Sequence, residues 1–131
     1  MMLRPSALDH VGLLVTDLEK SLRFYEALGL ELLRVVGPKE DGSRIAVLKV
    51  GNQELNVFSA PGVRSTDVRT SAGMDHFCLQ MDAAVVGELT AGLQQAGIAV
   101  VGGPVQRRDG TSLFVSDPDG IRVELLLKNR G

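Results

Sequence analysis

Residues 8–16 read LDHVGLLVT, and residues 74–82 read MDHFCLQMD. Each stretch has an apolar residue, an Asp-His pair and then a run that is typical of a β-strand. The two histidines, His10 and His76, are the only ones in the chain, and they lie 66 residues apart in a sequence of 131. Self-similarity at half the chain length predicts an internal duplication.

A helical pattern follows each Asp-His strand. Thr16-Asp17-Leu18-Glu19 has the form of a capping box with the glutamate at N3, and Gly29 stands where the first helix should end. In the second half we expect Asp82 to cap a helix that Gly97 closes in the same way. The apolar residues expected on the inner faces of the two helices are Leu18, Leu22, Tyr25 and Leu28, then Val86, Leu89, Leu93 and Ala96.

Three further strands are predicted in each half, separated by turn residues rich in glycine, proline and aspartate. They are 31–36, 44–50 and 54–58, then 98–101, 112–116 and 121–127; Gly102-Gly103-Pro104 and Asp117-Pro118-Asp119-Gly120 are among the expected turns. The predicted fold class is therefore α+β, a single domain of two βαβββ modules (about 7–60 and 74–128) joined by a loop at 61–73. The alternative is a generic α+β domain whose halves resemble each other by chance.

The polar residues of these strands fall on the face away from the helices, because strand side chains alternate between faces. A solvated sheet face would show the same pattern, but it would not predict that both histidines lie there. If the sheet curls into a cup, two imidazoles and one carboxylate meet on its concave side. That set suits Fe, Mn, Ni or Zn. The residues assigned to this face include His10, Glu54, Asn56, Phe58, His76, Cys78, Arg122 and Glu124.

The composition excludes several classes of protein. The formal net charge is -2 with basic residues thinly spread, so nothing favours nucleic-acid binding. No apolar run approaches the roughly 20 residues that span a bilayer, and the first residues do not form a secretory signal. The single cysteine, Cys78, excludes an internal disulfide framework, which predicts a reduced, cytoplasmic location.

The motifs together resemble the vicinal oxygen chelate superfamily, which includes glyoxalase I, extradiol ring-cleaving dioxygenases and the bleomycin and fosfomycin resistance proteins. The resemblance covers about residues 7–127. It rests on LDH at 8–10, VTDLEKSLRFYEALGLEL at 15–32, MDHFCL at 74–79, GGPV at 102–105 and, most specifically, FVSDPDGIRVELL at 114–126.

The resemblance implies metal ligands on the first, fourth, fifth and eighth strands. His10, His76 and Glu124 match three of these positions. The fourth-strand position usually carries Glu or Gln, but here it carries Asn56, a weaker ligand. Glu54, two residues earlier on the same face, would replace it only after a shift of register, and water is the remaining possibility.

The implied activity is a glyoxalase-I-like isomerisation or lyase reaction on a small substrate that chelates the metal through neighbouring oxygens, with Glu124 and Glu54 as candidate bases. A ring-cleaving dioxygenase is an alternative, although it usually needs a further histidine and a tyrosine. The only tyrosine, Tyr25, is expected in the core. A bleomycin- or fosfomycin-type resistance protein and a fold with a degraded site are further alternatives. The resemblance also implies a homodimer with shared sites.

Roles around the site are predicted as follows. Phe58 is expected to form a pocket wall, Cys78 to act as a small filler, and Arg122 to be either a substrate anchor or a solvated rim residue. Asp9 and Asp75 are expected to serve in turns or caps.

Overall fold

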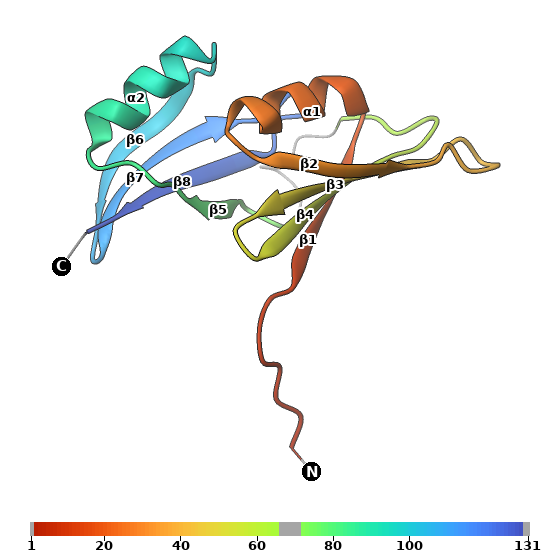
Figure 1. Ribbon diagram of the computed structural model, residues 1–131, viewed down its shortest axis with the longest axis horizontal. Coiled ribbons are helices and arrows are strands. Elements are labelled where there is room, and N and C mark those ends of the chain that lie inside the picture. Colours follow the sequence, from red (N-terminus) through yellow and green to blue (C-terminus); the bar gives the residue numbers. More distant parts are fainter. Residues whose placement is uncertain (1, 66–71, 130–131) are drawn as a thin grey trace. The chain divides into compact units, whose positions relative to one another are not determined.

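The computed structural model describes residues 2–65 and 72–129. The chain divides into two compact units, Met1–Ser65 and Thr66–Gly131 (Figure 1). Unit 1 contains β1 (His10–Val15), α1 (Leu18–Ala27), β2 (Glu31–Val36), β3 (Arg44–Val50) and β4 (Gln53–Ser59). Unit 2 contains β5 (Phe77–Gln80), α2 (Val86–Gln95), β6 (Val100–Arg107), β7 (Gly110–Ser116) and β8 (Arg122–Lys128).

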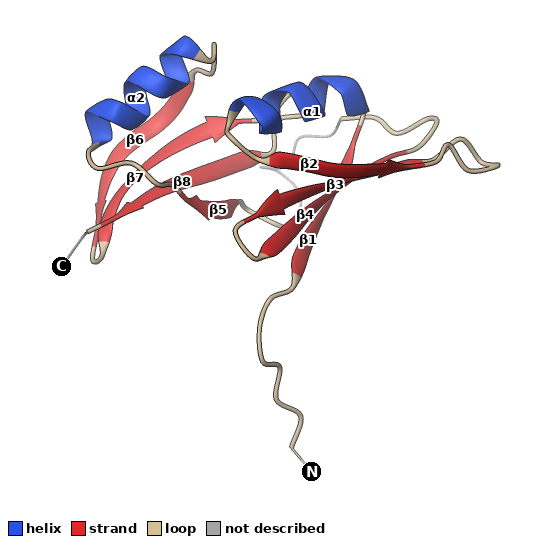
Figure 2. Cartoon of the chain, in the orientation of Figure 1, coloured by secondary structure: helices blue, strands red, loops and turns tan. Residues whose placement is uncertain are grey.

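Each unit is one helix beside one four-stranded mixed sheet (Figure 2). The strand orders are β1-β4-β3-β2 and β5-β8-β7-β6, so the two units have the same topology. The first and last strands of each unit pair in parallel, and the other pairs are antiparallel. The predicted α+β class and the repeated βαβββ order are confirmed. The joining of the two sheets into one cup stays a prediction.

The two helices end in the same way. Gly29 and Gly97 have φ angles of 103° and 74°, which favour glycine. The amide of Leu30 donates to the Tyr25 carbonyl over 3.1 Å, and that of Ile98 donates to Leu93 over 2.9 Å. These five-residue links are the C-terminal closure expected when a left-handed glycine follows a helix.

The helix starts differ from the prediction. Asp17, not Thr16, is the N-cap of α1, and its carboxylate accepts from the Lys20 amide over 3.1 Å. Glu19 does not close a capping box, because its carboxylate pairs with Arg44 on β3 over 2.6 Å. The predicted Asp82 cap is also wrong, because α2 begins after Val85 with no side-chain cap.

The core lies between each helix and the apolar face of its own sheet. Leu18, Tyr25 and Leu28 of α1 are buried, whereas Leu22 is only half-buried. In α2, Leu89 and Leu93 are buried, but Val86 is half-buried and Ala96 exposed. The sheet rows that complete these cores are Leu13, Val15, Leu55 and Val57 in unit 1, and Leu79, Val123, Leu125 and Leu127 in unit 2. The predicted alternation of strand faces is thus confirmed.

The strand β6 is longer than predicted. Gly102-Gly103-Pro104 was expected to be a turn, yet β6 continues through it to Arg107. The pairing with β7 shifts register between Val100 and Gly102 and again between Gly102 and Val105. Glycine and proline are therefore accommodated as irregularities within an edge strand, where a missing ladder hydrogen bond is tolerated.

The DPDG segment forms the predicted turn into β8. The Asp117 carboxylate accepts from the amides of Asp119 and Ile121 over 2.9 and 2.8 Å. The Asp117 amide donates to the Ile121 carbonyl over 2.9 Å. Asp117 is buried, so this turn sets the start of the strand that carries Glu124.

The predicted loop at 61–73 is free of helix and strand at 61–65 and at 72–73, while 66–71 fall outside the described residues. No helix in the described ranges has the length and apolar character needed to cross a membrane.

Two glycine-to-alanine changes should have opposite effects on stability. An added Cβ at Gly110 would overlap the Leu127 backbone and lie 2.8 Å from the Lys128 Cα, whereas at Gly92 in α2 it meets nothing within 4 Å. We expect Gly110→Ala to lower the free energy of unfolding by about 2–3 kcal/mol. Gly92→Ala should raise it by roughly 1 kcal/mol through helix propensity. Urea denaturation of both variants measures this, and equal shifts would contradict the β7–β8 packing.

Candidate metal centre

The polar face of unit 2 is organised by strand register. Phe114 on β7 pairs with Glu124 on β8, and Glu124 pairs with Cys78 on β5. Gly102 on β6 lies beside Phe114, so one row crosses all four strands. Residues in register share a face, and this row therefore lies opposite the helix, as the alternation of the strand predicts.

Glu124 is the buried carboxylate at the centre of this face, with 7% of the residue exposed. Its Oε2 accepts a hydrogen bond from the Ser112 hydroxyl over 2.6 Å and lies 3.3 Å from the Arg107 Nε. Desolvation by burial opposes ionisation of this carboxyl. The Ser112 hydroxyl and the positive charge of Arg107 outweigh that effect, so the pKa of Glu124 lies below its ordinary value.

His76 meets the other oxygen of the same carboxylate. Its Nε2 lies 2.9 Å from the Glu124 Oε1. Two atoms that bind one ion at about 2.1 Å and at right angles are about 3.0 Å apart. The observed separation is that of a direct ion pair, and it is also the spacing of two ligands of one cation.

Each histidine is oriented by the aspartate before it. The His76 Nδ1 lies 2.8 Å from the Asp75 carboxylate, and the His10 Nδ1 lies 2.8 Å from the Asp9 carboxylate. A carboxylate on one ring nitrogen directs the other nitrogen towards a metal, as in many metal sites. Asp9 and Asp75 thus contact the imidazoles, and their expected roles in turns or caps stay a prediction.

In unit 1, β1 and β4 place the remaining predicted residues side by side. His10 is in register with Glu54, and Gly12 is in register with Asn56. Leu14 is in register with Phe58. A Cβ on Gly12 would lie 3.3 Å from the Phe58 ring, so the missing side chain makes room for that ring on the polar face.

Asn56 takes the position in unit 1 that Glu124 takes in unit 2. Asn56 is in register with Gly12, two residues after His10, and Glu124 is in register with Cys78, two residues after His76. The side-chain Oδ1 of Asn56 is buried and has no hydrogen-bond partner in the described part of the chain. A buried amide oxygen without a donor is an available metal ligand. By the same register, Glu54 corresponds to Arg122.

The side chains on each polar face are of types that ligate divalent cations: an imidazole and an unpartnered amide oxygen in unit 1, and an imidazole and a carboxylate in unit 2. Within each unit, the described residues contain no group of three or more His, Cys, Asp or Glu side chains that would hold a metal alone. His76 and Glu124 come together in unit 2, while His10, Glu54 and Asn56 share one face of unit 1.

Ser112 and Phe114 were not among the predicted site residues. Both lie on β7 with the parity of the polar face, and both contact it: Ser112 bonds Glu124, and the Phe114 ring lies edge-on to the His76 ring at 5.9 Å. The available signal was their alternation with Leu113 and Val115, which are buried in the core. Because β7 pairs with β8, which carries Glu124, Ser112 and Phe114 lie close to that carboxylate.

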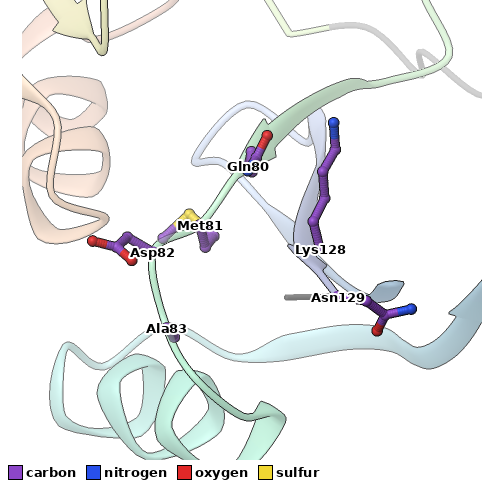
Figure 3. A pocket seen from close by; sticks show the side chains of 6 residues that line it. All are labelled: Gln80, Met81, Asp82, Ala83, Lys128 and Asn129. Carbon is purple, nitrogen blue, oxygen red and sulfur yellow. The ribbon is translucent and has the colours of Figure 1, made fainter. Parts of the chain in front are cut away.

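A separate hollow of about 290 Å³ lies where β5 and β8 end (Figure 3). The Asp82 side chain points away from Lys128 and Asn129 in this view (Figure 3). The hollow is lined by Gln80, Met81, Asp82, Ala83, Lys128 and Asn129. None of the predicted site residues lines it, and it carries no histidine.

Residues 7–125 match the Glyoxalase/Bleomycin resistance protein/Dioxygenase superfamily. The chain belongs to this superfamily. Members typically use divalent metals, bind small-molecule substrates and often form dimers. This membership confirms the resemblance seen in the Asp-His and DPDG motifs.

Individual relatives span several activities. The chain is 32% identical over 124 residues to a lactoylglutathione lyase of Salmonella typhimurium, covering 89% of each sequence. It is 30% identical over 131 residues to the mitochondrial methylmalonyl-CoA epimerase of Mus musculus, covering 90% of this chain and 71% of that one. The structure of a glyoxalase family protein from Enterococcus faecalis matches with a TM-score of 0.77 at 27% identity, covering 92% and 97%.

The thiol of Cys78 should react slowly in metal-free protein. Its desolvation, followed by the negative charge of Glu124, raises the pKa of Cys78 to about 11. At pH 8 only about 0.1% is then thiolate, against roughly a quarter for an ordinary thiol. We expect alkylation by iodoacetamide to be about 100-fold slower than for a free thiol and to speed up until pH passes about 11. Glu124→Gln should accelerate it, and a fast reaction at pH 8 in the parent protein would refute this.

Proposed function

We propose that the chain is a metal-dependent enzyme of the glyoxalase type, a lyase or isomerase acting on a small substrate that presents two neighbouring oxygens. The observation that supports this most is the 2.9 Å approach of the His76 Nε2 to the buried Glu124 carboxylate. The lactoylglutathione lyase relative adds support at the level of reaction type.

The proposed ligands are His10, His76 and Glu124, with Asn56 as a fourth. Fe, Mn, Ni and Zn all suit such a set. These residues would hold the cation, which would supply the positive charge that polarises a substrate carbonyl. We propose that the two modules form a single domain. We also propose a homodimer with shared sites, in which unit 1 of one chain and unit 2 of the other supply the ligands. A cytoplasmic location remains part of this proposal.

The two candidate bases differ in their surroundings. Glu124 already has three partners and a lowered pKa, which suits a permanently ionised ligand. Glu54 is half-buried on the same face as His10 and forms no ion pair with any described residue. We therefore assign Glu54 as the base that takes the proton from the carbon next to the substrate carbonyl, and returns it to the neighbouring carbon.

The buried core argues against ring cleavage. Tyr25, the only tyrosine, is completely buried in α1 and packs edge-on against Phe24 at 5.0 Å. It is therefore not placed to exchange protons with a substrate on the polar face of its sheet. Both histidines are used as proposed ligands, which leaves none for acid–base chemistry.

Replacing Asn56 by aspartate should strengthen metal binding. A carboxylate is a better ligand than an amide, so Asn56→Asp should tighten the affinity for Mn or Zn at least tenfold. Without metal the same change buries a charge and should lower the melting temperature, which added metal restores. Metal titration by calorimetry measures the first effect.

Asn52→Asp is the matched control, because it makes the same chemical change in the exposed turn before β4. Elemental analysis of His10→Ala, His76→Ala and Glu124→Ala should show loss of the metal. Equal affinities for the Asn56→Asp and Asn52→Asp proteins would exclude Asn56 as a ligand, and metal retained by all three alanine variants would exclude the site.

Replacing Glu54 by glutamine should separate chemistry from metal binding. We expect Glu54→Gln to lower turnover of the hemithioacetal of methylglyoxal and glutathione at least 100-fold, because the base is lost. The metal content should stay unchanged. Glu26→Gln, on the exposed side of α1, is the matched control. A Glu54→Gln enzyme as active as this control would refute the assignment, and a fully inactive metal-loaded parent would refute the reaction class.

A further inference from the structure

Arg122 is a cation without a counterion on the polar face of unit 2. It forms no ion pair with any residue in the described ranges, and its Nε is buried without a hydrogen-bond acceptor there. A buried guanidinium nitrogen that lacks an acceptor loses the hydrogen bonds it would make in water. Such a group is a candidate for binding an external anion.

The guanidinium is held in place by two neighbours. Its Cζ lies 4.4 Å from the centroid of the Phe114 ring, within the range of a cation–π contact. Its Nη2 lies against Gly102, where an added Cβ would come within 3.2 Å. The cation–π contact with Phe114 and the missing side chain at Gly102 together restrict the position of the guanidinium before any ligand arrives.

Arg107, the other arginine near Phe114, has a different role. Its Cζ is 5.8 Å from the same ring centroid, but its Nε lies 3.3 Å from the Glu124 carboxylate. The charge of Arg107 is therefore used to keep Glu124 ionised. Arg122 makes no such contact with a carboxylate of the described residues, so its guanidinium is unpaired on this face.

The position of Arg122 relates it to the proposed centre. It lies two residues before Glu124 on β8, which puts it on the same face at a Cα distance of about 7 Å. Arginine binds a carboxylate through two parallel hydrogen bonds, a geometry that suits recognition of a planar anion.

We propose that Arg122 forms a carboxylate-binding subsite, so that the substrate carries a carboxylate in addition to its two neighbouring oxygens. The subsite itself stands on the contacts of unit 2, whereas its meaning for the substrate rests on the proposed metal-dependent function. The arginine is specific to unit 2, because the position equivalent to Arg122 in unit 1 carries the acidic Glu54.

The first arm of the test uses the full chain without metal. Succinate is titrated into isotope-labelled protein, and the backbone amides of Gly102, Phe114 and Glu124 are followed by NMR. We expect saturable shifts at these amides and at least a tenfold higher Kd in Arg122→Gln. Arg122→Lys should bind succinate more weakly than the parent but more tightly than Arg122→Gln, because lysine keeps the charge and loses the paired hydrogen bonds. Arg108→Gln, an exposed control in the turn between β6 and β7, should stay within about twofold of the parent.

The second arm uses metal-loaded protein and compares 2-oxoglutarate with 2-oxobutyrate, which share a 2-oxo acid end but differ in the distal carboxylate. The parent should bind 2-oxoglutarate at least tenfold more tightly than 2-oxobutyrate, and Arg122→Gln should lose this difference in affinity. Arg108→Gln should retain it.

The two arms separate the two proposals. Shifts elsewhere on the protein, or equal effects of Arg122→Gln and Arg108→Gln in the metal-free arm, would overturn the subsite. Failure to load metal would overturn the proposed function and leave the subsite to be decided by succinate alone. Metal-loaded protein without preference for the dicarboxylate would overturn the inference about the substrate.

Discussion

The parallel pairing between the first and last strands of each unit is the constraint on which both polar faces depend. It places His10 beside Glu54 and Cys78 beside Glu124. Because side chains alternate along a strand, a slip of one residue would turn these groups towards the helix and expose apolar residues such as Leu13 and Val15. Each of those loses roughly 2 kcal/mol of burial energy. Packing of the core thus sets the position of the polar residues on the opposite face.

The same register buries the ionised carboxylate of Glu124, and side chains from the same unit stabilise its charge. An ionised carboxylate as buried as Glu124 costs several kcal/mol unless charged or hydrogen-bonding groups surround it. Ser112 and Arg107 supply these groups from β7 and β6, and His76 supplies the imidazole. The carboxylate is therefore already an oriented anion. Orientation in advance is what a tight metal site requires, since the ligands then lose little freedom on binding.

Apolar residues recur with a period of two in strands and 3.6 in helices. These patterns were enough to predict the order of the strands and helices, the internal repeat and the sheet face on which strand residues lie. Both Gly29 and Gly97 ended helices as expected. Interactions between distant segments were not predictable in this way. Glu19 satisfied the local rule for a capping box, yet its carboxylate pairs with Arg44, 25 residues later. The Gly102-Gly103-Pro104 turn failed for a similar reason, because pairing with β7 carries β6 through residues that favour a turn.

The two units share a topology but differ in the side chains on their polar faces. The histidines and their aspartates are the same in both halves, with Nδ1 contacts of 2.8 Å in each. The neighbouring strand positions differ: Asn56 and Glu54 in unit 1 correspond to the buried Glu124 and the unpaired Arg122 in unit 2. A pair of identical halves would offer two carboxylates of one kind. In the proposed enzyme, these substitutions let one repeated backbone supply a neutral ligand (Asn56), a base (Glu54), an anionic ligand (Glu124) and an anion-binding group (Arg122).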